Sequence, residues 1–134
     1  MSEQTKNYRA INFAEKLSQI TDRWQPRVMA ALNDYQFKIV KIEGDFIWHD
    51  HPETDEAFIV LDGTLLIDMP DGTVSIGAGE LHVVSKGVRH RPRAQGVVSM
   101  ILIEPKGTLN TGREGGERTV ENDLWIESIS RKSA

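Results

Sequence analysis

The feature that most constrains the fold is a series of short apolar runs, separated by turn-forming residues, that extends from residue 27 to residue 103. The joints include Asp62-Gly63, Pro70-Asp71-Gly72, Gly77-Ala78-Gly79 and Gln95-Gly96, which are typical of tight turns. Short runs bounded in this way are typical of β-strands, so the sequence predicts an all-β sandwich or barrel. The predicted strands are 27–32, 35–40, 46–51, 56–61, 64–69, 73–76, 81–84, 89–92 and 97–103.

Helical periodicity is present only near the start of the chain. Phe13, Leu17 and Ile20 recur at helical spacing after Asn12, which suits an N-cap, with Glu15 as the acidic residue of a capping box. We therefore expect one short helix over about 12–22. The 134 residues suit a single domain, 1–134, with a barrel core at about 36–104 and a glycine-rich loop at 105–123.

Composition excludes several classes of function. The net charge of −4 argues against a nucleic-acid-binding groove, which needs clustered cations. No apolar run approaches the roughly 20 residues of a membrane span, and the first residues lack the apolar core of a signal peptide, so we expect a cytoplasmic protein without membrane contact. The absence of cysteine means that any bound metal must be held by nitrogen and oxygen. A small molecule is the expected ligand.

Three histidines and one glutamate form a candidate metal site. His49 and His51 are two residues apart, so on a strand their rings point to the same side, while Phe46 and Trp48 point to the other. Glu56 begins an apolar run, where a carboxylate needs a partner, and His90 follows downstream. This ligand set suits one divalent ion of zinc, iron, manganese, nickel or cobalt. The residues that we expect to line a pocket beside it are Phe58, Val60 and Met100.

Other polar residues are weaker candidates. If His90 points inward, alternation turns Arg89, Arg91 and Arg93 outward, which favours a solvated or interface face over an anion site. We expect His82 at the rim and Tyr35 in a structural role.

The charged residues that flank the ligands do not define a further site. Asp50, Glu53 and Asp55 suit a solvated acidic connection, and Lys38 and Lys86 are possible counter-charges. The segment 111–116 is glycine-rich but lacks the lysine of a phosphate-binding loop, so it is expected to be a mobile loop.

At these positions the sequence resembles the cupins, a superfamily of small double-stranded β-helix (jelly-roll) barrels. Its first motif is matched by Gly44, His49, His51, Glu56 and Gly63, with four residues rather than five between the first glycine and histidine. Its second motif is matched by Gly79, Gly87 and His90, but Ser85 replaces the usual proline and Ala94 the usual asparagine. Within the superfamily the chain looks most like the stand-alone single-domain cupins labelled mannose-6-phosphate isomerase-like. The resemblance implies the barrel and the four metal ligands, and it says little about substrate.

Two functions remain open at this level. The first is a metal-dependent enzyme with isomerase- or dioxygenase-type chemistry on a small chelating molecule, although the catalytic residues are unknown. The second is a non-catalytic small-molecule binder or metal sensor, since no residue is an evident acid or base. We also expect a homodimer, because an open barrel leaves edge strands such as 28–32 and 124–126 to be covered.

Overall fold

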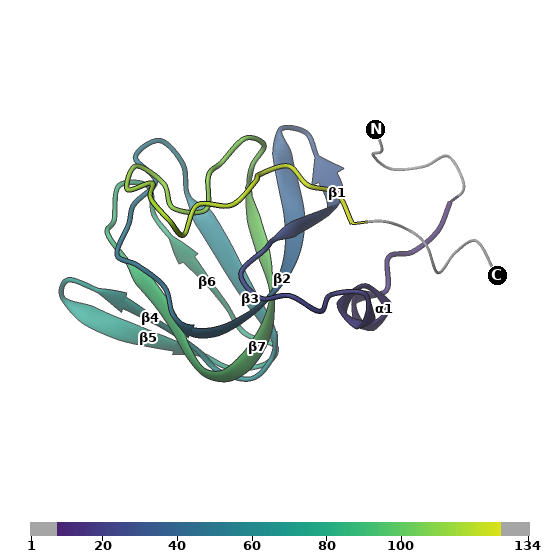
Figure 1. Ribbon diagram of the computed structural model, residues 1–134, viewed down its shortest axis with the longest axis horizontal. Coiled ribbons are helices and arrows are strands. Elements are labelled where there is room, and N and C mark those ends of the chain that lie inside the picture. Colours follow the sequence, from purple (N-terminus) through teal and green to yellow (C-terminus); the bar gives the residue numbers. More distant parts are fainter. Residues whose placement is uncertain (1–7, 127–134) are drawn as a thin grey trace.

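The computed structural model describes residues 8–126, which form one short helix and a curved antiparallel β-sheet (Figure 1). The all-β class predicted from the sequence is confirmed, and seven strands make up the sheet. The elements are α1 (Phe13–Ser18), β1 (Arg27–Leu32), β2 (Tyr35–Asp45), β3 (Glu56–Asp62), β4 (Leu65–Met69), β5 (Gly72–Ile76), β6 (Leu81–Val84) and β7 (Arg91–Pro105).

The long strand β7 organises the barrel by changing partners along its length. One edge of β7 pairs with β2 along most of its length, and the second half of the other edge pairs with β3, giving the order β1-β2-β7-β3-β6. Its first half pairs with β4, which forms a hairpin with β5. Figure 1 shows β7 (green) curving beneath the other strands between these two groups. This curvature closes the sheet around an interior.

Alternation along the strands separates an interior core from a second apolar layer outside the sheet. Val40 and Met100 face inward and pack with Phe58, whereas Ile39 and Ile101, one residue away in each strand, face outward. Ile20, just beyond α1, packs on that outer layer. Side chains from several strands therefore fill the interior of the barrel. Space for a functional site is left at one end.

The helix is shorter than predicted. It covers Phe13–Ser18 rather than 12–22, although Asn12 is its N-cap and accepts a hydrogen bond at Oδ1 from the backbone N–H of Glu15, at 2.9 Å. The residues that follow leave the helix so that Ile20 can enter the outer layer. Tertiary packing thus ends the helix before the apolar periodicity does.

One predicted strand and one predicted turn are absent, and β2 (Tyr35–Asp45) is longer than the predicted strand 35–40. Residues 46–51 form no strand, and only His49 makes a β-bridge there, with His90. The joint Gln95-Gly96 is not a turn: it lies within β7, at an irregularity where Gly44 pairs with Ala94 and Ile42 with Val98. The extra residues on β7 are accommodated as a bulge, which bends the strand while preserving its direction.

The chain itself covers one proposed dimer edge. The N–H of Val28 donates to the carbonyl of Leu124 at 2.8 Å, and the N–H of Ile126 donates back to Val28 at 3.1 Å. Segments that we expected to pair with a second subunit therefore pair with each other at this point. The homodimer itself stays a prediction. Across the described residues, no helix is long and apolar enough to cross a membrane.

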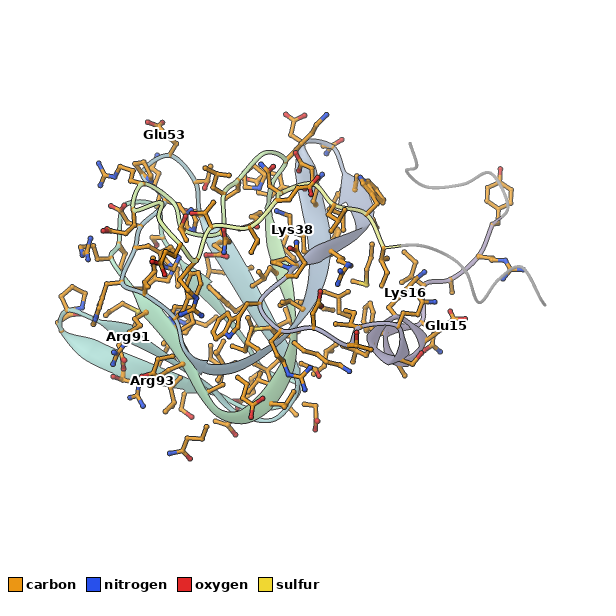
Figure 2. The ribbon with its side chains drawn as sticks, viewed as in Figure 1. Glu15, Lys16, Lys38, Glu53, Arg91 and Arg93 are labelled. Atoms are coloured by element: carbon orange, nitrogen blue, oxygen red, sulfur yellow. The ribbon has the colours of Figure 1, made fainter. Side chains whose placement is uncertain are left out.

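Arg91 and Arg93 lie on the outer side of β7, as the alternation predicts (Figure 2). Both guanidinium groups bind the carboxylate of Asp68 on β4, with the shortest contacts at 2.9 Å for Arg91 and 2.7 Å for Arg93. Hydrogen bonds from Arg93, from the Thr73 hydroxyl and from Arg91 hold the pKa of Asp68 well below its usual value. The two arginines therefore link β7 to β4 through Asp68.

We expect replacement of Asp68 by asparagine to lower the free energy of unfolding at pH 7 by about 1–2 kcal/mol. The folded-state pKa of this carboxyl is lowered, so its contribution is complete above the ordinary value of 3.8 and is lost as the pH falls below that value. The difference in free energy of unfolding between wild type and Asp68→Asn should therefore become smaller as the pH falls from 5 to 2. Urea denaturation at each pH measures this difference. Asp71→Asn, at the exposed tip of the same hairpin, is the control, and an equal loss there would contradict the assignment.

Candidate metal centre

Two loops bring the three histidines together at one end of the barrel. His49 and His90 exchange backbone hydrogen bonds of 3.0 and 2.9 Å, and the N–H of Gly87 donates to the carbonyl of His51 at 2.9 Å. Gly87 has a φ of +81°, a conformation that side chains disfavour, so glycine is needed to turn the chain toward His90. Backbone pairing therefore fixes the spacing of the three rings.

Hydrogen bonds to the backbone set the tautomers of two of these rings. Nδ1 of His49 lies 3.0 Å from the carbonyl oxygen of Ile47, and Nδ1 of His90 lies 2.9 Å from that of Val88. Since a carbonyl only accepts, each Nδ1 carries the hydrogen, and each Nε2 keeps a free lone pair. This is the arrangement commonly found around metal-binding histidines.

The fourth donor is the carboxylate of Glu56, at the start of β3. Its Oε1 lies 3.3 Å from Nε2 of His51 and 3.5 Å from Nε2 of His90, and no described residue satisfies any of these three buried atoms. Ligand atoms from all four residues lie within 4.8 Å of one another. Two donors bound at about 2.1 Å to one metal are themselves about 3.0–3.4 Å apart, so the cluster fits a cation.

The protonation of His49 also suits a ligand. Burial disfavours the imidazolium, and the positive charge of a protonated His90 would disfavour it further, which lowers the pKa of His49 to about 4. His49 is therefore neutral at pH 7. The Nε2 lone pair of His90 and the Glu56 carboxylate oxygen are both buried acceptors, 3.5 Å apart, which is costly unless a cation joins them.

A cavity of about 430 Å³, including its open mouth, adjoins the cluster. His49 and Glu56 lie in its wall, together with Phe58 and Met100 of the predicted pocket. Val60 does not line the cavity but is fully buried in the interior core. The remaining lining residues are Trp24, Pro26, Val40, Ile42, Phe46, Pro92, Leu102, Glu104 and Asn110. The cavity wall is mainly apolar, as is usual for small-molecule sites.

Phe46 lies on the same side as the metal ligands, contrary to the prediction. Its ring makes an edge contact with His49 at a centroid distance of 5.2 Å and stacks on Trp24 at 5.0 Å. Alternation failed here because residues 46–51 are not in a regular strand. Trp24 was missed altogether, since no sequence pattern connects it to the site.

Comparison with known proteins identifies the family of this chain. The sequence profile of the cupin domain matches residues 37–104, about half of the chain. The chain belongs to the cupin family. It is 35% identical over 79 residues to the uncharacterized protein YdbB of Bacillus subtilis, covering 58% of this chain and 70% of that protein.

Two solved structures resemble this chain over more of its length. A cupin-2 domain protein from Shewanella frigidimarina is 50% identical, with a TM-score of 0.71, over 72% of this chain and 94% of the other. Protein NMB1881 from Neisseria meningitidis is 36% identical, with a TM-score of 0.67, over 73% of this chain and 100% of the other. These matches confirm the jelly-roll barrel implied by the motifs.

Both residue replacements in the second cupin motif are accommodated locally. The carbonyl of Ser85 accepts a hydrogen bond from the N–H of Val88 at 3.2 Å, so the turn forms without proline. Ala94 is buried in the interior core and pairs with Gly44 and Leu65. Neither replacement displaces a member of the four-residue cluster.

The segment after β7 packs over the metal-ligand loop. Asp50, between the two histidines, is buried and accepts hydrogen bonds from the guanidinium of Arg113, including one of 3.0 Å from Nε. Thr111 is fully buried, and Figure 1 shows this part of the chain (yellow-green) crossing one end of the barrel. Gly112 and Arg113 therefore contact the loop that carries the ligands, whereas Glu114 and Gly116 are exposed, and Asp50 is not part of the solvated connection that we predicted.

A second charged pair, Lys38 and Glu104, is buried beside the metal cluster. Nζ of Lys38 donates to Oε2 of Glu104 at 2.7 Å. Burial and the neighbouring negative charge of Glu56 together raise the pKa of Glu104 well above its ordinary value. Sequence reasoning missed Glu104, although alternation with Met100 and Leu102 along one strand places it on the inner face.

The remaining candidates lie outside the site. His82 is half-buried on β6 and is not part of the metal cluster, and Tyr35 is 43% exposed. Glu53 is exposed on the loop in Figure 2. Lys86 is exposed as well, and its backbone N–H donates to the Asp55 carboxylate at 2.8 Å.

Proposed function

We propose that this cupin holds one divalent metal through His49, His51, Glu56 and His90 and acts there on a small polar molecule that chelates the metal. One observation carries the proposal: four buried donors converge beside a cavity, and no described residue hydrogen-bonds the facing atoms of His51, Glu56 and His90. A bound metal would supply Lewis-acid or redox chemistry, which corresponds to isomerase-type or dioxygenase-type reactions.

The residues of the chain would prepare the site for such chemistry. The backbone carbonyls of Ile47 and Val88 orient two imidazoles, so the ligand atoms need little rearrangement when they bind. Phe46, Phe58 and Met100 give the cavity an apolar wall that limits water around a bound molecule. The site can thus position a ligand and exclude water.

The alternative is a non-catalytic cupin that binds or senses a small molecule or a metal. It is favoured by the state of Glu104, the one ionisable group of the cavity wall outside the metal cluster among the described residues, because Lys38 already pairs with it. A reaction that needs proton transfer would have to use a group of the substrate or a metal ligand.

Elemental analysis of protein purified without added metal tests the proposal most directly. We expect close to one equivalent of a divalent metal per chain, and the metal found selects the reactions to assay. Oxygen consumption and conversion of a panel of sugars, keto acids and catechols would then separate enzyme from binder. Failure of the wild-type protein to bind any of the five candidate metals would overturn the proposal.

A further inference from the structure

We propose that Glu104 recognises the ligand of this site by accepting a hydrogen bond at Oε1 from an O–H or N–H group, while the same molecule chelates the metal. This inference rests on the proposed function, and it assigns a specificity-determining role to a residue outside the metal ligands. Lys38 would act as a positioning residue that keeps the carboxylate in place.

The environment of Glu104 supports this role. The residue is 2% exposed and lines the cavity, Oε2 is bound by Nζ of Lys38, and no described residue donates to the buried Oε1. The 2.7 Å ion pair with Lys38 indicates that Glu104 is a carboxylate, so Oε1 can only accept, and a buried carboxylate oxygen without a donor is costly. A ligand donor entering the cavity would remove this cost.

The placement of the pair explains how one molecule could reach both groups. Glu104 and the metal ligand Glu56 line the same cavity. Lys38, on β2, lines a neighbouring hollow whose wall also includes Glu104, Val120 and Asn122. Lys38 therefore holds Oε2 from behind and leaves Oε1 to the cavity.

The charges around the cavity indicate the class of ligand. None of the described residues that line the cavity is lysine or arginine, and the charge of Lys38 is matched by Glu104. The nearby Arg118 guanidinium stacks over Trp24 and Phe46 and donates to the carbonyl of Asp45 at 3.3 Å. The wall thus favours a molecule with an apolar body and an uncharged hydroxyl or amine donor over a phosphorylated one.

Two pairs of chelators test the inference. The two members of each pair differ by one hydroxyl group, and the pairs place this group at different distances from the chelating oxygens. Kojic acid and allomaltol differ at the side of the ring away from the chelating oxygens, and glycerate and lactate differ next to them. Binding to the cobalt(II)-loaded protein can be followed by the visible spectrum of the metal. We expect the hydroxylated member of at least one pair to bind about tenfold more tightly to the wild type. Equal affinities within both pairs would overturn the proposal without any variant.

Two variants then assign the preference to Glu104. Glu104→Gln keeps the shape but weakens the acceptor, and the double variant Lys38→Met with Glu104→Leu removes both charges, so neither is left unpaired. The preference should fall to twofold or less in the double variant and to an intermediate value in Glu104→Gln. A preference that survives in the double variant would contradict the role of Glu104.

The cobalt spectrum before any chelator is added separates this inference from the proposed function. If the wild type binds no cobalt, the proposed function fails. If it binds cobalt but Glu104→Gln does not, Glu104 is a metal ligand and the recognition role is wrong. If both bind cobalt equally and only the chelator preference changes, the inference is supported.

Discussion

Replacement of His49 by alanine should abolish metal binding by this cupin and any turnover with it. His49 contributes a neutral imidazole whose Nε2 faces the cluster, and its loss leaves three of the four donors. Changes to residues that only support a metal ligand typically weaken binding by about 10–100-fold, so loss of a ligand should cost at least about 100-fold. Elemental analysis and a metal titration monitored by thermal unfolding would measure the effect.

The control for this variant is His82→Ala, which removes an imidazole from β6, outside the cluster. It should retain the metal content of the wild type. The thermal stability of metal-free His49→Ala should be compared with that of the metal-free wild type, so that loss of packing is not mistaken for loss of metal. Turnover retained by metal-free protein would contradict the metal mechanism.

Replacement of Gly112 by alanine should lower both the free energy of unfolding and the affinity for metal. The added Cβ would lie 1.8 Å from the carbonyl oxygen of Asp50, and φ at this position is +58°. Relief of the clash requires the segment 111–116 to move away from the loop that carries His49 and His51. The total loss in free energy of unfolding should be roughly 3 kcal/mol. Because Asp50 lies between His49 and His51, the separation also disturbs the ligands. Urea denaturation and metal titration measure the two effects.

Gly115→Ala is a matched control within the same segment. Gly115 has a similar φ of +64°, but a Cβ added there would meet no atom of a more distant residue within 4 Å. This variant should show only the cost of the backbone conformation, about 1–2 kcal/mol, with unchanged metal affinity. Equal losses in the two variants would show that contact with Asp50 is not what holds the segment.

Local sequence was most informative where the chain is regular. In the strands from residue 56 onward, alternation correctly placed Phe58 inward and Arg91 and Arg93 outward, since a regular strand has a fixed period. Between residues 46 and 51 the same rule misplaced Phe46, because a single bridge at His49 does not impose the period. Similarly, Gln95-Gly96 has the composition of a turn but is a bulge, which only its partner strand reveals.

The amino-acid sequence by itself determined the cupin barrel and the identity of its four convergent metal-ligand candidates. Strand period, turn residues and motif spacing are properties of neighbouring residues, so they can be recognised without coordinates. Only the tertiary structure decided what surrounds those ligands: the Arg113 contact with Asp50 and the Lys38–Glu104 pair join residues 63 and 66 positions apart. Such contacts depend on how the closed sheet and its covering segment pack, and no local pattern encodes that packing.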